Sequence, residues 1–170
     1  MDLVLELLED PAYRHVLLNH LPVSGLAVAW LVLGFSVFER RWSTMVFALS
    51  LVLITSASAN PVMSAGDDAY PFVFDSLDGV GRDWLDHHVL IAERWGRLHL
   101  VNAFVAGAAI GLGFYRSRWR IGVGVVVLVS TLAALAASAV IAEGGGKVRH
   151  PEFRLEDPPI HETPGRLRRS

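Results

Sequence analysis

The sequence contains no cysteine, which excludes disulfides, iron–sulfur clusters, zinc sites with thiolate ligands and covalently attached c-type haem. Charged residues make up only 19% of the 170 residues, and the formal net charge is -2. No basic patch with interleaved aromatic side chains is present, so we expect no nucleic-acid partner. The chain also lacks a phosphate-binding loop, a nucleophile triad and a carboxylate pair beside a base. These absences argue against a stand-alone enzyme.

Apolar residues are abundant instead: 52% of the chain is hydrophobic and the mean hydropathy is +0.41. Long apolar runs cover residues 16–38, 42–60, 88–115 and 119–142. Each run can cross a hydrocarbon core of about 30 Å, which needs about 20 helical residues. The acidic start, MDLVLELLED, differs from the basic start of a secretory signal, so we expect the first run to remain as a helix. We predict an all-α fold, an integral membrane four-helix up-down bundle in one domain.

The runs divide the chain into three segments. Residues 1–15 are predicted to be an interfacial N-terminal segment, with Asp10 as N-cap and Pro11 opening the first helix, which Pro22 then bends. Residues 16–142 are predicted to be the four-helix transmembrane domain, with an external loop at residues 61–82 that is rich in glycine, proline and aspartate. Residues 143–170 are predicted to be a C-terminal external tail, because three glycines at 144–146 favour helix termination.

Basic residues indicate the orientation in the membrane. Arg40 and Arg41 lie between the first two runs, and Arg116 and Arg118 lie between the last two. Short loops rich in arginine and lysine face the cytoplasm in most membrane proteins. We therefore predict a multi-pass protein whose two termini lie on the periplasmic side.

The third predicted helix, residues 83–115, carries two histidines above a stripe of small residues. His88 and His99 are eleven residues apart, which at about 100° per residue returns to within roughly 20° of one face. The residues beneath them on that face have little bulk: Ala92, Gly96, Ala103, Ala106 and Gly107. Such a stripe leaves room for a flat group, and we predict a b-type haem. Small residues also allow helices simply to pack closely.

The depth of each histidine in the membrane indicates which histidines could bind one ligand together. His20 lies about 27 Å of helix above residue 38, and His99 lies about 24 Å above residue 115. The first and third helices of an up-down bundle are diagonal neighbours, so these two imidazoles suit a bis-histidine haem. His88 and His150 lie higher and could form a second, outer site, and pairings of His20 with His88 or His150 stay open. The other histidines are interpreted as surface residues: His15, His87 and His161.

Four motifs, in order, resemble a functionally uncharacterised family of small bacterial four-helix membrane proteins. They are LNHLPVSG at 18–25, PVMSAGDDA at 61–69, DHHVLIA at 86–92 and GGKVRHPE at 145–152. The first and last are similar to the family's LNHxPxxG and GGx[IV]RHxE signatures. The resemblance implies a cytochrome-b-like protein and implies His20, His88 and His150 as haem ligands. It does not imply His99, which only the depth argument gives. His20 is the ligand that the resemblance and the pairing by depth share.

From these observations we expect a membrane-anchored b-type haem protein or redox subunit at the periplasmic face of a bacterial inner membrane. It would carry one haem b, or two, and exchange electrons with a quinol, a periplasmic cytochrome or other subunits of a redox or photosynthetic complex. One alternative is a non-catalytic scaffold subunit whose histidines only contact headgroups or water. Another is a copper, zinc or iron site formed by His88, His99 and His150 with a carboxylate such as Glu93 or Glu152.

Overall fold

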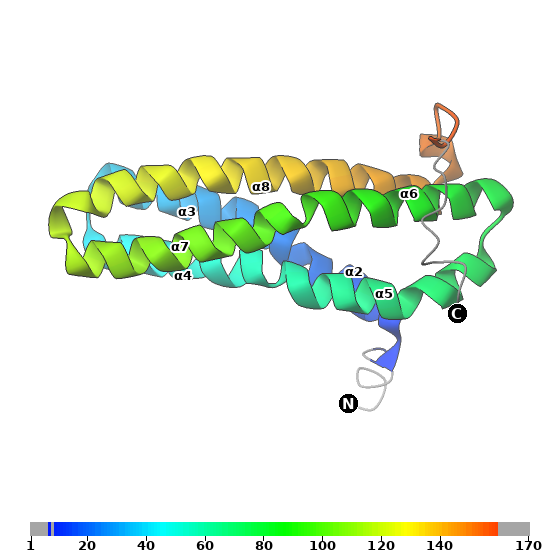
Figure 1. Cartoon of the computed structure of the whole chain (residues 1–170), viewed down its shortest axis with the longest axis horizontal. Helices are drawn as coiled ribbons and strands as arrows, with labels where there is room; N and C mark the ends of the chain where they lie inside the picture. The colour runs from blue at the N-terminus through cyan, green and yellow to red at the C-terminus, as the bar shows by residue number, and fades with distance from the viewer. Residues whose placement is uncertain (1–6, 8, 160–170) are drawn as a thin grey trace.

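The computed structural model describes residues 7 and 9–159, and these form four long helical rods packed as an all-α bundle (Figure 1). Residues 1–6 and 8 of the predicted N-terminal segment lie outside the described residues. The first rod consists of α2 (Pro11–His20), a π-helical turn (Leu21–Gly25) and α3 (Leu26–Glu39). Asp10 caps α2, as predicted, by accepting a 2.8 Å hydrogen bond from the backbone N–H of Ala12.

The other three rods follow in up-down order. The second is α4 (Trp42–Ala57) and α5 (Ala59–Ser76), and the third is α6 (Gly79–Trp95) and α7 (Arg97–Tyr115), with a break at Gly96. After a 3-10 turn (Ser117–Trp119), α8 (Arg120–Arg149) forms the fourth rod, and a last 3-10 turn spans Pro151–Phe153. The four-helix prediction is therefore confirmed.

The predicted external loop at residues 61–82 is wrong, because most of that segment is helix α5 and the start of α6. Its apolar residues Val62, Ala65 and Ala69 recur at helical spacing and are buried, chiefly against α2. Packing of this face outweighs the low helix propensity of the proline, glycine and aspartate residues. Pro61 lies in the first turn of α5, where a missing backbone N–H is tolerated.

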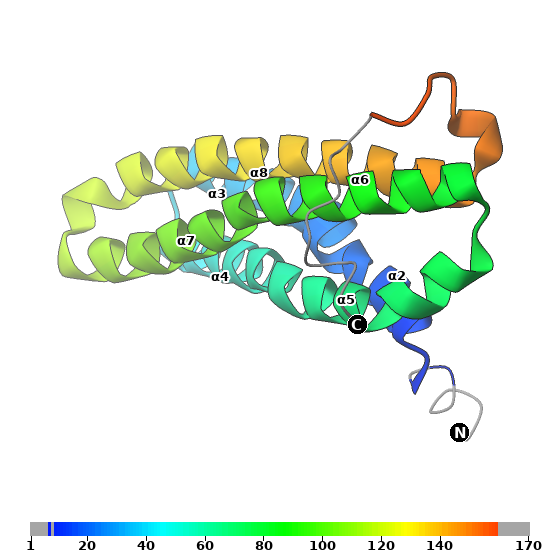
Figure 2. The same cartoon turned by 45° about the vertical axis from the view of Figure 1, so that its right-hand side comes forward.

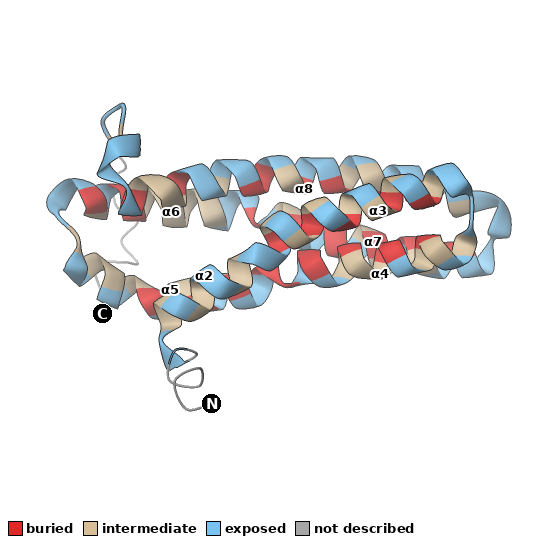
Figure 3. Cartoon of the chain, turned by 180° about the vertical axis from the view of Figure 1, so that it is seen from behind, coloured by how far each residue is buried: buried red, intermediate tan, exposed pale blue. Residues whose placement is uncertain are grey.

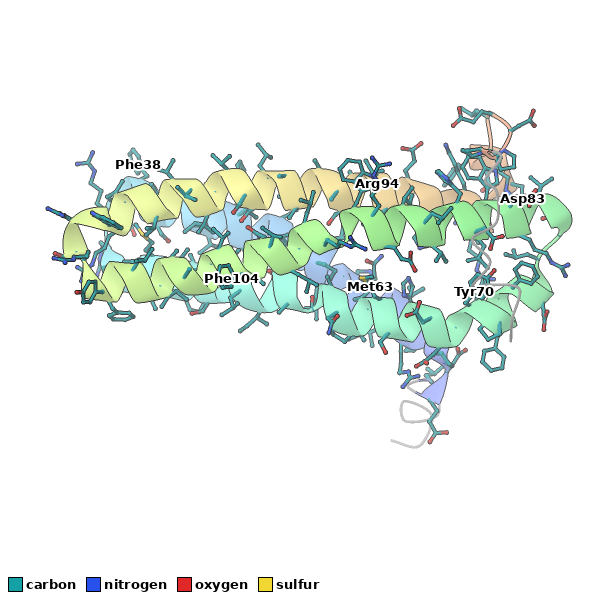
Figure 4. The ribbon with its side chains drawn as sticks, in the orientation of Figure 1. Phe38, Met63, Tyr70, Asp83, Arg94 and Phe104 are labelled. Carbon is teal, nitrogen blue, oxygen red and sulfur yellow. The ribbon has the colours of Figure 1, made fainter. Side chains whose placement is uncertain are left out.

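Four rods are long and apolar enough to cross a membrane: Pro11–Glu39, Trp42–Ser76, Gly79–Tyr115 and Ser117–Arg149. Large apolar side chains cover the outside of the bundle, including Phe38 (84% exposed) and Phe104 (77% exposed), both labelled in Figure 4. Such a surface is suited to lipid and not to water. The chain is a multi-pass membrane protein in contact with the bilayer.

The core is unevenly distributed along the bundle. Toward the α3–α4 and α7–α8 turns, Leu33, Leu49 and Val127 are completely buried between α3, α4, α7 and α8. Toward the other end, α2 packs mainly on α5 and α6 mainly on α8. These two pairs diverge, as Figures 1 and 2 show, and Figure 3 shows fewer buried residues along them. A cleft at this end is lined by residues of both pairs.

The predicted helix end at the glycine triplet is also wrong, since α8 continues to Arg149. Arg154 then caps α8 by donating hydrogen bonds to the carbonyl oxygens of Lys147 (2.7 Å) and Val148 (2.9 Å). Lys147 lies over the Trp84 ring of α6 and forms a 2.8 Å hydrogen bond with Glu156. That hydrogen bond lowers the pKa of the Glu156 carboxyl. The chain after α8 is therefore tied back to the α6–α8 pair.

Substitution by alanine is expected to have opposite effects on stability at two glycines of α7. A β-carbon at Gly113 would collide with the Trp42 indole, whereas one at Gly111 would have no atom within 4 Å. We expect Gly113→Ala to destabilise the bundle by about 1–2 kcal/mol, because overpacking outweighs the better helix propensity of alanine. Gly111→Ala should be neutral or stabilising by up to about 1 kcal/mol. Unfolding in mixed detergent micelles measures both, and equal effects would contradict the packing at Trp42.

Candidate functional site

The cleft between the α2–α5 and α6–α8 pairs contains two hollows. The inner hollow, of about 110 Å³, is lined mainly by apolar side chains and reaches down to His99 and Ser138. The outer hollow, of about 140 Å³, extends toward Val148 near the end of α8. Five residues line both hollows: His15, Gly66, Tyr70, Leu85 and His88. The hollows therefore meet at the level of two histidines.

His15 of α2 and His88 of α6 face each other across this cleft. Their ring centres are 6.4 Å apart and their planes are almost perpendicular, at 88°. Nδ1 of His15 lies 2.9 Å from the carbonyl oxygen of Val62. A carbonyl only accepts hydrogen bonds, so Nδ1 carries the proton and Nε2 keeps its lone pair. Nδ1 of His88 is buried and has no hydrogen-bond partner among the described residues.

Glycines make room for both imidazoles. A β-carbon at Gly66 of α5 would lie 2.9 Å from Nδ1 of His15, closer than ordinary van der Waals contact. On the other side of the cleft, a β-carbon at Gly145 of α8 would lie 3.2 Å from Cε1 of His88. A neighbouring β-carbon at Gly144 would lie 2.5 Å from Cδ1 of Ile91. The glycine triplet thus allows α8 to approach α6 closely at His88. This packing stabilises the helix, so α8 does not end at the triplet.

His99 lies at the inner end of the cleft and is 2% exposed. Its Nε2 is 3.0 Å from Oγ of Ser138, and Ser138 Oγ donates a 3.1 Å hydrogen bond to the carbonyl oxygen of Pro22. Nδ1 of His99 is buried and has no hydrogen-bond partner within the part of the chain that the structure describes. Pro22 belongs to the π-helical turn, a feature that occurs often at functional sites.

Tyr70 of α5 bridges the cleft near its outer end. Its hydroxyl group donates a 2.6 Å hydrogen bond to Oδ1 of Asp86 on α6. Figure 4 places Met63 and Tyr70 on the side of α5 that faces α6. The sulfur of Met63 contacts α6–α7 at Gly96, where a β-carbon would lie 3.1 Å away. The two helix pairs are thus connected by side chains from α5.

The structure brings together only two of the four predicted site residues. His88 and His99 line the same inner hollow. His20 is exposed, and its Nδ1 contacts the carbonyl oxygen of Val16 in its own helix at 2.9 Å. His150 is also exposed, 3.0 Å from Glu152 and stacked on Phe153. His20 and His99 therefore do not face each other, and the ligand roles of the four histidines stay predictions.

His15 is the residue that the sequence interpretation assigned to the surface although it lines both hollows. Its spacing from Pro22 gives its direction once Pro22 is known to be buried. His15 precedes Pro22 by seven residues, which is two helical turns, and Asn19 lies one turn below it. A buried proline therefore marks the inner face of this helix, and that face carries His15 and Asn19 into the cleft.

The alternative metal centre is not assembled. Among residues 7 and 9–159, no group of three or more histidine, aspartate or glutamate side chains lies close enough together to hold a metal ion. Glu93 lines the inner hollow with His88 and His99, whereas Glu152 pairs with His150 away from both hollows. A copper, zinc or iron site with three protein ligands stays a prediction.

Comparison with known proteins gives one family. Its profile, described as "Domain of unknown function (DUF389)", matches residues 20–147, which include His20, His88, His99 and the glycine triplet but not His15. No curated protein and no solved structure matches the chain. The haem and the sequence signatures of the resemblance stay predictions. Because the match covers most of the sequence, the chain belongs to the DUF389 family of domains of unknown function.

Proposed function

We propose that the chain is a membrane-anchored b-type haem protein that carries electrons at the periplasmic face of a bacterial inner membrane. One observation carries the proposal: His15 and His88 face each other at 6.4 Å where two apolar hollows meet. The proposed pair of His15 and His88 replaces the pairings considered from the sequence alone. His88 was already among the ligands predicted from the sequence, and His15 was not.

The spacing and chemistry of the two imidazoles support iron binding. Two imidazoles that bind one metal from opposite sides at about 2.0 Å place their ring centres about 6 to 6.5 Å apart. The bond from His15 to the Val62 carbonyl fixes the ring and leaves Nε2 as the coordinating nitrogen. Histidines that bind metals almost always donate their other N–H in this way. His88 lies opposite His15 and lines both hollows, so its imidazole would be the second ligand.

The hollows support a planar group centred between these rings. A macrocycle extends in all directions from its metal, so it requires space both inward and outward of the imidazole pair. The hollows of about 110 and 140 Å³ lie on these two sides. Each alone is smaller than the range of about 300–1,000 Å³ for sites of drug-sized ligands. A haem therefore also requires the α2–α5 pair to move outward from α6–α8. Haem bound there supplies one-electron chemistry.

The location of the cleft supports the periplasmic assignment. The rods are 29 to 37 residues long, whereas about 20 helical residues cross the hydrocarbon core. With the arginine-containing turns at one edge of the core, the opposite ends, which carry the cleft, would project beyond the other edge. If the arginine-rich turns at Arg40 and Arg116 face the cytoplasm, the cleft faces the periplasm. Acidic residues on the projecting helices, such as Asp68 and Asp83, suit exposure to water.

Absorbance of the purified protein tests the proposal. After expression with a haem supply, we expect a Soret band, and His15→Ala and His88→Ala should each weaken haem binding at least tenfold. His20→Ala and His150→Ala are matched controls and should retain the band, because both side chains lie outside the hollows. A folded protein without a Soret band would overturn the proposal and favour a scaffold subunit. Loss of the band in His20→Ala alone would overturn the assigned pair.

A further inference from the structure

We infer that the inner end of the cleft binds a hydroquinone, with Nδ1 of His99 accepting the hydrogen bond of one ring hydroxyl. The inference goes beyond the haem proposal because it assigns a ligand to His99, which is not one of the proposed haem ligands although it lines the same inner hollow as His15 and His88. Because the haem would also extend into this hollow, hydroquinone binding is tested on the haem-free protein. It rests on the proposed redox function only for the choice of a hydroquinone over other apolar phenols. The cleft geometry alone requires a hydroxyl or other hydrogen-bond donor.

The protonation of His99 follows from its neighbours. The Pro22 carbonyl can only accept a hydrogen bond, so the single hydroxyl hydrogen of Ser138 is used there. Oγ of Ser138 then acts as the acceptor in its 3.0 Å contact with Nε2 of His99. Nε2 therefore carries the proton, and Nδ1 of the neutral ring has a free lone pair. His99 lines the inner hollow, and we assign this lone pair to the ligand bound there.

Because Nδ1 of His99 is buried, it should select ligands that donate a hydrogen bond. His99 is 2% exposed, and its Nδ1 has no partner among the described side chains and backbone groups. A buried nitrogen without a hydrogen bond is unfavourable, and a ligand that donates one removes the penalty. A ligand of the same shape that offers only acceptors leaves the penalty in place and adds repulsion between lone pairs. The site thus distinguishes a hydroxyl group from a carbonyl group.

The walls around His99 suit a flat apolar ring. Ala59 of α5 and Ala92 of α6 face the inner hollow, and Gly96 lies at the break between α6 and α7. These residues have little or no side chain. Val23 and the flexible Met63 add to the apolar lining. A planar ring fits between such walls more readily than a branched ligand does.

The depth of His99 suits a molecule dissolved in the bilayer. His99 lies sixteen residues before Tyr115, about 24 Å of helix, and so near the outer edge of a core of about 30 Å. A hydroquinone with an apolar tail carries a neutral polar head at this level. A phospholipid would have to bury its charged headgroup in an apolar hollow, which is strongly unfavourable. The hydroquinone is therefore the favoured ligand.

Three decyl-substituted compounds test the inference on the haem-free full-length protein in nanodiscs under argon. They are the hydroquinone, the corresponding quinone and the hydroquinone dimethyl ether, which has the same ring but no donor. Titration calorimetry should show that the hydroquinone binds at least tenfold more tightly than the other two. Equal affinity of the three compounds would overturn the inference.

Variants separate the role of His99 from effects on folding. His99→Leu should abolish the preference for the hydroquinone, whereas His150→Leu should retain it. Ser138→Ala frees Nε2, so Nδ1 can carry the proton and donate to a carbonyl. The quinone should then bind as well as the hydroquinone or better. An unchanged preference in either His99→Leu or Ser138→Ala would overturn the inference.

The same experiment distinguishes this inference from the haem proposal. His15→Ala should weaken haem binding at least tenfold yet keep the hydroquinone preference. His15 lines the inner hollow, but its ring contacts the Val62 carbonyl and not the His99–Ser138 pair. A protein that binds haem but shows no hydroquinone preference would refute only the ligand assigned to His99. A protein that shows the preference but no Soret band would refute only the haem proposal.

Discussion

Gly66→Leu is expected to abolish haem retention while the bundle stays folded. The first side-chain atom would already lie 2.9 Å from Nδ1 and 3.1 Å from Cε1 of His15. A full leucine would therefore displace the imidazole, break its hydrogen bond to the Val62 carbonyl and fill the level where the two hollows meet. We expect no detectable Soret band at haem concentrations that saturate the native protein.

Gly111→Leu is the matched control for this substitution. Gly111 is exposed on α7, and a β-carbon there has no atom within 4 Å, so the leucine would project into lipid. Haem retention and unfolding in detergent should match the native protein. Helical circular dichroism of Gly66→Leu should also be close to native, because its side chain enters a cleft and not the packed core. Normal haem binding by Gly66→Leu would show that the cofactor lies elsewhere.

The four-helix architecture could be predicted from hydropathy because each rod contains a run of about 20 apolar residues. The same criterion missed α5. Its buried face consists of small residues, Ala65 and Ala69, and the residues between them are Gly66, Asp67 and Asp68, of which both aspartates are exposed. Helices that project beyond the hydrocarbon core do not require uniform apolarity. Their stability comes from one buried face, which composition alone does not reveal.

The glycine triplet shows why local propensity was insufficient at the end of α8. Three successive glycines disfavour a helix because the unfolded backbone has more freedom to lose. Here Gly144 and Gly145 allow α8 to pack against Ile91 and His88, and that packing maintains the helix to Arg149. Only the position of α6 gives these glycines their role. A sequence without its tertiary contacts favours termination.

Depth could be predicted for the histidines, but direction could not. His20 and Pro22 are two residues apart, so they point about 200° from each other around the helix. Pro22 is buried, and His20 therefore faces outward although its level was close to that of His99. His15 lies two turns from Pro22 and faces inward. One known inward residue on each helix would have been enough to choose between the two histidines.

The buried polar group at Asn102 predicts the largest loss of stability. Its Nδ2 donates a 2.8 Å hydrogen bond to Ser56 of α4, and its Oδ1 accepts from Ser130 (2.6 Å) and Thr131 (3.2 Å) of α8. Asn102 itself is 1% exposed on α7. These three bonds connect three helices in the half of the bundle that lipid surrounds. Hydrogen bonds between membrane helices average about 0.6 kcal/mol, with values up to about 1.7.

Asn102→Leu should therefore destabilise the bundle by roughly 2–3 kcal/mol, measured by unfolding in mixed micelles of mild and denaturing detergent. Without Asn102, the Ser130 hydroxyl can donate to the Val127 carbonyl oxygen, 3.1 Å away, which limits the loss. Ser50→Ala is the control, because the Ser50 hydroxyl donates to the Val46 carbonyl of its own helix and to no other group among the described residues. It should change stability by less than about 0.5 kcal/mol. If both variants unfold at the native detergent fraction, packing of the apolar core is sufficient and the Asn102 network does not hold α4, α7 and α8 together.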